Sequence, residues 1–283
     1  MALKPPVEVP QGAIRLNTDS QKLEFFAQDQ WWEMATYVGS DNTGGIRGLF
    51  YRGYVGPTNS NVIDYITMSS AGNAVDFGDA LTDARQAGAT GSNTRAVVVG
   101  RNSANNTIEY VTFASAGDAA DFGDSTANRA GAPSAVSNGT RGIFAGGEAP
   151  GLSNIIDYIT IAQTGNAIDF GDLSVIHSDG GRSQSSTRGI IAGGRTSPDP
   201  YTNVIDYITI ATTGNGIAFG DLTAATGSPS AMFSSTRGLC SHKSPSTVVD
   251  YVEILTTGNS VDFGDMANAA SDASGFSNAH GGL

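Results

Sequence analysis

Hydrophobic and polar residues in the middle of the chain alternate in short runs that predict β-strands. In the run from Asn154 to Ala162 (NIIDYITIA), Ile155 and Ile159 lie on one face of an extended strand. Ile156 and Tyr158 make the other face apolar as well. A strand that is apolar on both faces belongs to a sheet that is covered on both sides.

This strand belongs to a group of four predicted strands. Ser134–Asn138 is a short strand of small residues, and Thr140–Gly147 is an apolar strand that ends in a glycine pair. Asn154–Ala162 is the third strand, and Ala167–Leu173 is the fourth. Gly165-Asn166 lies between the last two, and this dipeptide between β-rich runs predicts a two-residue hairpin turn.

The group of four strands recurs along the chain. The third strand of each copy contains a tyrosine, and these tyrosines are spaced by about 44 to 49 residues: Tyr65, Tyr110, Tyr158, Tyr207 and Tyr251. A repeat of this length indicates a solenoid, a propeller or an array. Four-stranded antiparallel sheets stacked around an axis cover both faces of each sheet, so we expect an all-β fold, a five-bladed β-propeller over residues 36–283.

The order of the strands resembles the kelch repeat. A small-residue strand comes first, followed by an apolar strand ending in Gly-Gly, a strand with a tyrosine and a strand with an aromatic residue. Gly146-Gly147, Gly193-Gly194 and the Tyr158-type positions carry the match, which covers residues 36–283 as a pattern. Phe170 and its equivalents replace the usual tryptophan, and copies one, two and five lack the full glycine pair. The resemblance implies kelch-like four-stranded antiparallel blades.

The two ends of the repeat region predict how the propeller closes. The first copy has no small-residue strand before Ile46, whereas such a strand follows the last copy at Ser274–Asn278. We therefore expect this C-terminal strand to be the innermost strand of the first blade, which closes the ring and removes its exposed edges.

Residues 1–35 differ from the repeats. An arm with three prolines precedes short alternating runs that predict a small β meander, too short to bury its own apolar surface. Phe25, Phe26, Trp31 and Trp32 form adjacent pairs, and adjacent strand residues point to opposite faces. Two interpretations are open. Either both faces pack within the chain, or one face packs on a sister subunit and makes this segment an attachment and oligomerisation module.

The string GAIR-x-NTD-x-x-K-LE followed by tryptophan resembles a module near the N-terminus of phage tail fibres and other virion appendage proteins. The match is carried by Gly12, Ala13, Ile14, Arg15, Asn17, Thr18, Asp19, Lys22, Leu23, Glu24 and Trp31 or Trp32. The resemblance implies a bacteriophage virion structural protein, a tail fibre or another tail or capsid appendage, made in the host cytoplasm and located in the virion. It implies other virion proteins as partners, and a homotrimer is the first expectation because appendages are commonly symmetric. The propeller is expected to bind a host-surface glycan or protein, or a virion protein.

Composition and charge narrow the classes of function. The chain has 283 residues and a net charge of −12, with 15% charged and 39% hydrophobic residues. It is too apolar for a disordered chain, and its diffuse acidity argues against nucleic acid or an anionic membrane as partner. The chain has neither the apolar core of a signal peptide nor an apolar run of about 18 residues, so we expect a soluble protein without membrane insertion. The one cysteine, Cys240, is expected to be a buried thiol.

An arginine and an acidic residue recur at fixed positions. The arginines begin the second strand of each copy: Arg47, Arg95, Arg141, Arg188 and Arg237. The acidic residues precede the tyrosine of the third strand: Asp64, Glu109, Asp157, Asp206 and Asp250. A buried unpaired carboxylate is costly, so we expect each arginine to pair with one of these acids, within a blade or between two blades. The alternative is that the five arginines line a channel that captures an anion.

The sequence contains no catalytic, metal or cofactor signature. Asp-Phe-Gly-Asp ends four copies, as at Asp169–Asp172, and its two carboxylates fit turn capping better than calcium, which takes about six to eight oxygens. His177, His242 and His280 occupy unrelated repeat positions, which argues against a metal site. We therefore expect a protein that is not an enzyme and has no cofactor. The alternatives are a glycan-processing propeller enzyme and a free-standing kelch-type adaptor that binds protein.

The loops between the second and third strands differ most among the copies. Variable loops on a rigid scaffold commonly carry binding specificity. The longest of them is Arg195–Thr202, and we expect Pro200 and Tyr201 in it to contact a ligand.

Overall fold

The computed structural model describes residues 9–17, 22–28, 30–33, 47–100, 105–148, 150–198, 200–271 and 275. The chain divides into two compact units, Met1–Ser40 and Asp41–Leu283, a little beyond the boundary that we expect after residue 35. Every regular element among the described residues is a β-strand, so the predicted all-β class is confirmed.

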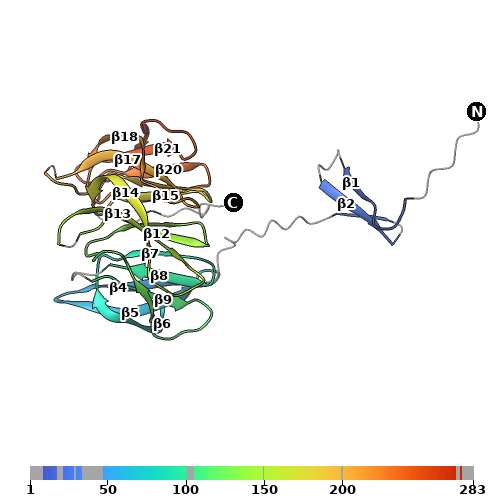
Figure 1. Cartoon of the computed structure of the whole chain (residues 1–283), viewed down its shortest axis with the longest axis horizontal. Helices are drawn as coiled ribbons and strands as arrows, with labels where there is room; N and C mark the ends of the chain where they lie inside the picture. Colours follow the sequence, from blue (N-terminus) through green and yellow to red (C-terminus); the bar gives the residue numbers. More distant parts are fainter. Residues whose placement is uncertain are drawn as a thin grey trace, which may run out of the picture. The chain divides into compact units, whose positions relative to one another are not determined.

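The N-terminal unit contains a three-stranded antiparallel sheet in the order β1-β2-β3, drawn in blue in Figure 1. Its strands are β1 (Ile14–Asn17), β2 (Lys22–Ala27) and β3 (Gln30–Glu33). Ile14 pairs with Phe25, and Phe25 pairs with Trp32, so these three side chains share one face. The predicted meander is confirmed, and its aromatic pairs are split between the two faces.

The second unit, here called the repeat unit, contains five antiparallel sheets that follow one another along the chain. The first sheet has three strands, β4 (Arg47–Val55), β5 (Thr58–Thr67) and β6 (Val75–Ala84). The second has β7 (Gly88–Gly91), β8 (Arg95–Val99), β9 (Thr107–Thr112) and β10 (Ala120–Asp124). The third has β11 (Ser134–Ser137), β12 (Arg141–Ala145), β13 (Ser153–Thr160) and β14 (Ile168–His177). The fourth has β15 (Gly181–Gln184), β16 (Arg188–Ala192), β17 (Thr202–Thr209) and β18 (Ile217–Thr226). The fifth has β19 (Ala231–Phe233), β20 (Arg237–Ser241), β21 (Val248–Glu253) and β22 (Val261–Asp265).

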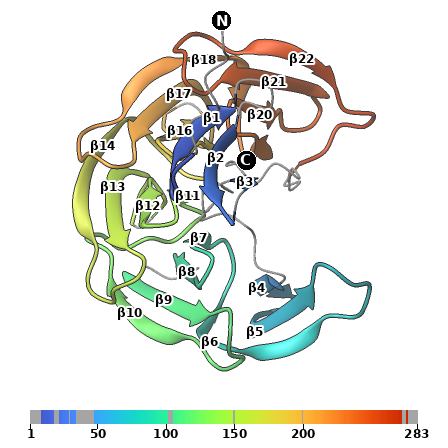
Figure 2. The same cartoon turned by 90° about the vertical axis from the view of Figure 1, so that its right-hand side faces the viewer.

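The five sheets follow one another around a common centre, as Figure 2 shows. The first strands of the four-stranded sheets, β7, β11, β15 and β19, are innermost, and each contacts the next. Neighbouring sheets are joined by side-chain packing and not by strand pairing, and among the described residues no strand of the fifth sheet makes extensive contacts with the first. Of the expected closing strand Ser274–Asn278, only Gly275 is described, next to Ala231 of β19, and the rest lies outside the described residues.

The core lies between the faces of neighbouring sheets. Between the third and fourth sheets, Ile143 and Ile156 pack with Ile191 and Ile208, all nearly inaccessible to solvent. Equivalent clusters fill the junctions between the first and second, second and third, and fourth and fifth sheets. Strands that are apolar on both faces are thereby covered on both sides, as predicted from Asn154–Ala162.

The predicted hairpin between the third and fourth strands is confirmed, since β13 pairs with β14, but its turn is not the two-residue Gly165-Asn166. The chain turns earlier, where the Gln163 amide donates to the Thr160 carbonyl oxygen at 3.0 Å. The Gly165 amide instead donates to the carbonyl oxygen of Phe122 in the preceding sheet, at 2.7 Å. The glycine and asparagine therefore join two sheets, and their positions between two strands do not reveal this from the sequence.

Candidate functional site

The repeat arginines do not pair with the repeat acids, so this prediction is wrong. The Arg141 guanidinium lies 4.2 Å from the centre of the Tyr158 ring, and its Nη1 donates to the carbonyl oxygen of Ile210 in the next sheet at 3.0 Å. The same two contacts are made by Arg47, Arg95 and Arg188. Arg237, in the last sheet, also stacks on its tyrosine but pairs with Glu253. The arginines therefore act as clamps within and between sheets.

Strand register explains why the pairing fails. Arg141 pairs with Thr160, and Ile143 pairs with Tyr158, so the arginine and the tyrosine share one face of the sheet. Asp157 precedes the tyrosine and lies on the other face. Because the arginine contacts lie between sheets and not along the innermost strands, the alternative of an arginine-lined channel has no support.

The repeat acids bind the end of the preceding sheet. Asp206 accepts hydrogen bonds from the backbone amide and the hydroxyl of Ser174, both at 2.8 Å. Asp250 accepts the same two bonds from Thr223, also at 2.8 Å. In the other junctions, Asp157 accepts from Thr126, and Glu109 accepts from the Leu81 amide. These four carboxylates are buried and each joins two sheets, which is a structural role.

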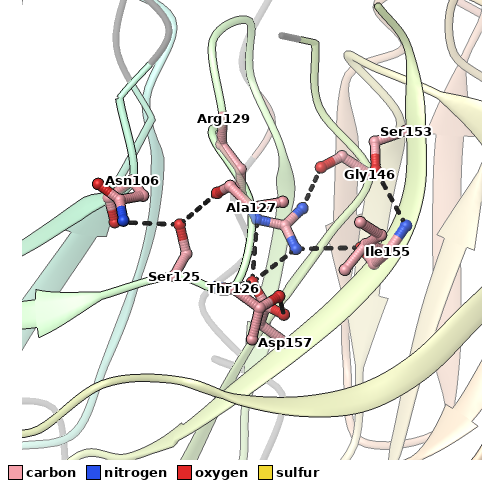
Figure 3. A network of polar contacts seen from close by, with 9 residues as sticks. All are labelled: Asn106, Ser125, Thr126, Ala127, Arg129, Gly146, Ser153, Ile155 and Asp157. Atoms are coloured by element: carbon pink, nitrogen blue, oxygen red, sulfur yellow. Dashed lines mark hydrogen bonds and ion pairs between the residues drawn. The ribbon is translucent and has the colours of Figure 1, made fainter. Parts of the chain in front are cut away.

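Asp157 also takes part in a buried ion pair that the sequence analysis missed. Arg129 reaches it from the loop between β10 and β11, with 2.8 Å between Nη2 and Oδ2 and at most 1% of either side chain exposed. Figure 3 shows that the same guanidinium also donates to the carbonyl oxygens of Gly146 and Ile155. Arg129 occurs in one copy only, so the repeat pattern carries no signal of it. A guanidinium whose donors are used internally anchors the fold and leaves no group for a ligand.

A second buried cluster contains a serine, a histidine and an aspartate. Nε2 of His242 lies 3.0 Å from Oδ2 of Asp250, and the Ser260 hydroxyl donates to the same oxygen at 2.8 Å. A catalytic triad needs a histidine between serine and aspartate, whereas here the aspartate is the shared partner. Burial acts to raise the pKa of Asp250, but hydrogen bonds from Thr223, His242 and Ser260 lower it overall. Burial, together with the charge of Asp250, raises the pKa of the Cys240 thiol to about 12, so this cysteine is the unreactive buried thiol that we expect.

The two predicted loop contacts have different environments. Pro200 is exposed, whereas Tyr201 is partly buried and its hydroxyl lies 3.1 Å from Nζ of Lys243, which donates a hydrogen bond. A side chain on Gly227 would overlap the tyrosine ring, so the ring packs closely against the backbone there. Tyr201 thus holds the loop in place, and Pro200 is the accessible residue of the two.

The two faces of the N-terminal sheet differ in their contacts. On one face, the rings of Phe26 and Trp31 meet edge to face at 5.3 Å, and Arg15 lies 4.0 Å from the Trp31 ring and 2.7 Å from Glu24. The other face, here called the apolar face, carries Ile14, Leu16, Phe25 and Trp32, which are 63%, 60%, 37% and 45% exposed. Among the described residues of this unit, no element covers the apolar face.

Within the described part of the chain, no three histidine, cysteine, aspartate or glutamate side chains come together as metal ligands. The same residues contain no helix with the length and apolar character needed to cross a membrane.

Comparisons with known proteins show a similarity of fold but do not assign the chain to a family. No family model matches the chain, and no curated protein matches it. Among solved structures, the chain is similar to the structure of YjhT, with a TM-score of 0.61 and 8% sequence identity over 77% of this chain and 82% of that chain. At this level of identity the similarity concerns only the arrangement of the backbone, an all-β fold of antiparallel sheets.

Proposed function

We propose that this protein is a bacteriophage virion structural protein, a tail fibre or another appendage of tail or capsid. The N-terminal unit assembles the chain with sister chains and other virion proteins, and the repeat unit is displayed outward. The apolar face carries this proposal, because it lies within the segment whose sequence resembles the virion module. A three-stranded sheet with one bare apolar face needs a partner to be stable in water.

The partner that best fits the apolar face is the same face of a sister chain. Its four side chains are apolar, so a second copy is complementary without any pairing of charges. The opposite face is already occupied by the contacts of Arg15 with Trp31 and Glu24, which directs assembly to one side of the sheet. A homotrimer is our first model, since closed symmetric oligomers are usual for such assemblies.

Light scattering on the full chain tests this assembly. The double substitution Ile14→Ser and Leu16→Ser should reduce a trimer to a monomer, because both side chains are largely exposed on the apolar face. Val55→Ser changes an equally exposed residue of the repeat unit, at 65%, and should leave the mass unchanged. A wild-type monomer would contradict self-assembly.

Mass spectrometry of purified particles of the phage that encodes the chain tests the virion role separately. The absence of this protein from the particles would refute that role.

We also propose that the repeat unit is a closed five-bladed kelch-like propeller. At the four formed junctions, the phenylalanine of the outer strand is 2% or 3% exposed: Phe77, Phe122, Phe170 and Phe219. Phe263 has the same position in the fifth sheet and is 55% exposed. A fifth junction, with the first sheet, would bury it in the same way.

The first sheet carries the groups that such a junction needs. At each formed junction, an aspartate or asparagine side chain accepts the amide hydrogen of an aspartate in the preceding sheet: Asp118 from Asp79, Asn166 from Asp124, Asn215 from Asp172 and Asn259 from Asp221. Asn73 has the accepting position in the first sheet, and Asp265 has the donating position in the fifth. Likewise, Asp64 corresponds to the four buried acids that bind the preceding sheet.

A cysteine pair at these two positions tests ring closure. Asn73→Cys with Asp265→Cys should form a disulfide within one chain, as should the control pair Asn259→Cys with Asp221→Cys at a formed junction. Cys240 does not interfere, because it is buried and its pKa is raised to about 12. A disulfide between two chains would mean that the fifth sheet binds the first sheet of another molecule. Failure of the first pair alone would mean that the ring is open.

The contacts of the repeat acids support a role that is not enzymatic. A glycosidase needs two carboxylates that face the substrate, and the four buried acids instead hold backbone and hydroxyl groups of the neighbouring sheet. Binding of a host-surface glycan or protein is therefore assigned to the displayed loops, with the exposed Pro200 in the longest of them.

A further inference from the structure

A cavity of about 500 Å³ lies between the innermost strands of the repeat unit. Its walls come from the second to the fifth sheets and include Gln86, Ala132, Arg182, Ser230 and Phe233. A second cavity of about 280 Å³ is lined by residues of β7, β11, β15 and β19, among them Arg182 and Phe233 again. These two side chains therefore stand where the cavities meet, in what is here called the central channel.

Arg182 is the exception at a repeat position that otherwise holds small residues. In the innermost strands, Ala89 pairs with Val98, Ala135 with Phe144, Arg182 with Ile191 and Ala231 with Cys240. The corresponding residue of the last small-residue run in the sequence is Gly275. The equivalent strands thus form with alanine at this position, so an alanine is compatible with the register of the innermost strand.

The Arg182 guanidinium is partly buried and has no counter-ion. Burial lowers the pKa of this group, which means that its charged form is poorly solvated. Among the described residues, no carboxylate or carbonyl oxygen accepts a hydrogen bond from it, in contrast to the fully bonded Arg129. A partly buried cation without a counter-ion is incompletely hydrated, so an anion bound beside it would be stabilised.

We propose that the central channel binds a small organic monocarboxylate, with Arg182 as its counter-ion. A planar guanidinium matches a carboxylate with two parallel hydrogen bonds. One negative charge fits better than two, because Asp179 also lines the larger cavity and would repel a second anionic group, although its carboxylate has partners in Ser178 at 3.2 Å and Arg195 at 3.8 Å. The Phe233 ring offers an apolar surface, and the Ser230 hydroxyl and Gln86 amide offer polar groups, a combination that suits a sugar acid. The site does not depend on the virion role.

Calorimetry on the full chain tests the site with three probes: D-glucuronate, acetate as the bare carboxylate, and D-glucose as the neutral match. The wild type should bind glucuronate and not glucose. Arg182→Ala introduces the residue found at the equivalent positions and should weaken glucuronate binding about tenfold or more, as expected for the loss of charge-assisted hydrogen bonds. Arg237→Ala, a change of an exposed arginine outside the channel, should leave binding unchanged. Equal binding by the wild type and Arg182→Ala, or no binding of either carboxylate to the wild type, would overturn the proposal.

Thermal unfolding without ligand provides a second test. Arg182→Ala should raise Tm, because it removes a partly buried cation that has no counter-ion, and glucuronate should raise the Tm of the wild type but not that of the variant. A lower Tm for the ligand-free variant would show that the guanidinium already has a partner within the chain, and the proposal would fall.

Discussion

The junction between the fourth and fifth sheets and the free face of the fifth sheet contain the same residue types in opposite environments. Phe219 is 3% exposed and Phe263 is 55% exposed, although they lie at equivalent positions of β18 and β22 and contact a tyrosine of their own sheet at about the same distance, 6.1 and 6.0 Å. The arginines differ likewise, since Arg188 reaches the next sheet and Arg237 pairs with an exposed glutamate of its own sheet. The contacts within a sheet are therefore set by the repeat itself, whereas burial is set by the neighbouring sheet.

The largest effect is expected where a formed junction contains a buried ion pair. Asp157→Ala would leave the Arg129 guanidinium buried without a counter-ion, so the free energy of unfolding should fall by about 3 to 5 kcal/mol. Glu253→Ala breaks the exposed pair with Arg237 and should change it by about 1 kcal/mol or less. Chemical unfolding of the two variants measures both values. Similar effects would mean that Arg129 finds another acceptor.

Phenylalanine substitutions compare the formed junction with the proposed one. Phe219→Ala should lower the free energy of unfolding by about 3 to 5 kcal/mol, because it leaves a cavity between two sheets. If the ring closes, Phe263→Ala should lower it by a similar amount. Urea unfolding of both variants at one protein concentration decides the matter, since an effect of about 1 kcal/mol or less for Phe263→Ala alone contradicts closure.

The sequence predicts the positions of the strands well, but it predicts less well which residues of other strands and sheets they contact. Runs such as Asn154–Ala162 identify strands because alternation and apolar character are local properties. The pairing of Arg141 with an acid fails because it depends on register, which places Asp157 on the other face. The turn expected at Gly165-Asn166 is not formed there, because a glycine with positive φ serves a hairpin turn or an inter-sheet contact equally well.

The candidate sites likewise divide into features that depend on local pattern and features that depend on three-dimensional packing. The split of Phe25 and Phe26 between two faces is predictable because it depends on strand periodicity alone. The anchoring role of Arg129 is not predictable, because a single arginine in a loop has no pattern. Arg182 was visible in the sequence as the exception among small residues, but its unpaired state depends on what surrounds it in three dimensions.

Acid should lower the free energy of unfolding through the buried His177, which ends β14 of the third sheet. Burial lowers the pKa of His177 to about 4 from 6.5, so between these values the unfolded chain binds a proton that the folded chain does not. Stability is therefore lost as the pH falls from about 6.5 to 4, by about 3 kcal/mol in total, and is unaffected by this group above that range.

A matched variant isolates the contribution of this histidine. Thr226 ends the outer strand of the fourth sheet as His177 ends that of the third, so His177→Thr inserts the neighbour's residue. The wild type should lose about 3 kcal/mol more than the variant between pH 7 and pH 4, measured by urea unfolding. Parallel losses would show that the histidine is protonated in the folded protein.

The smallest effect concerns a single hydrogen bond at each junction. Asn215 accepts the amide hydrogen of Asp172 at 3.1 Å, so Asn215→Ala should reduce the free energy of unfolding by about 1 kcal/mol. Asn73 has the same position in the first sheet and contributes as much to the free energy of unfolding only if the fifth sheet is packed on it.

Amide hydrogen exchange detects the contact of Asn73 better than unfolding does, because it reports on one donor at a time. In a closed ring the Asp265 amide should be protected like the Asp172 amide, and Asn73→Ala should remove that protection while leaving Asp172 unchanged. Fast exchange at Asp265 in the wild type would instead show that the fifth sheet keeps its outer face free.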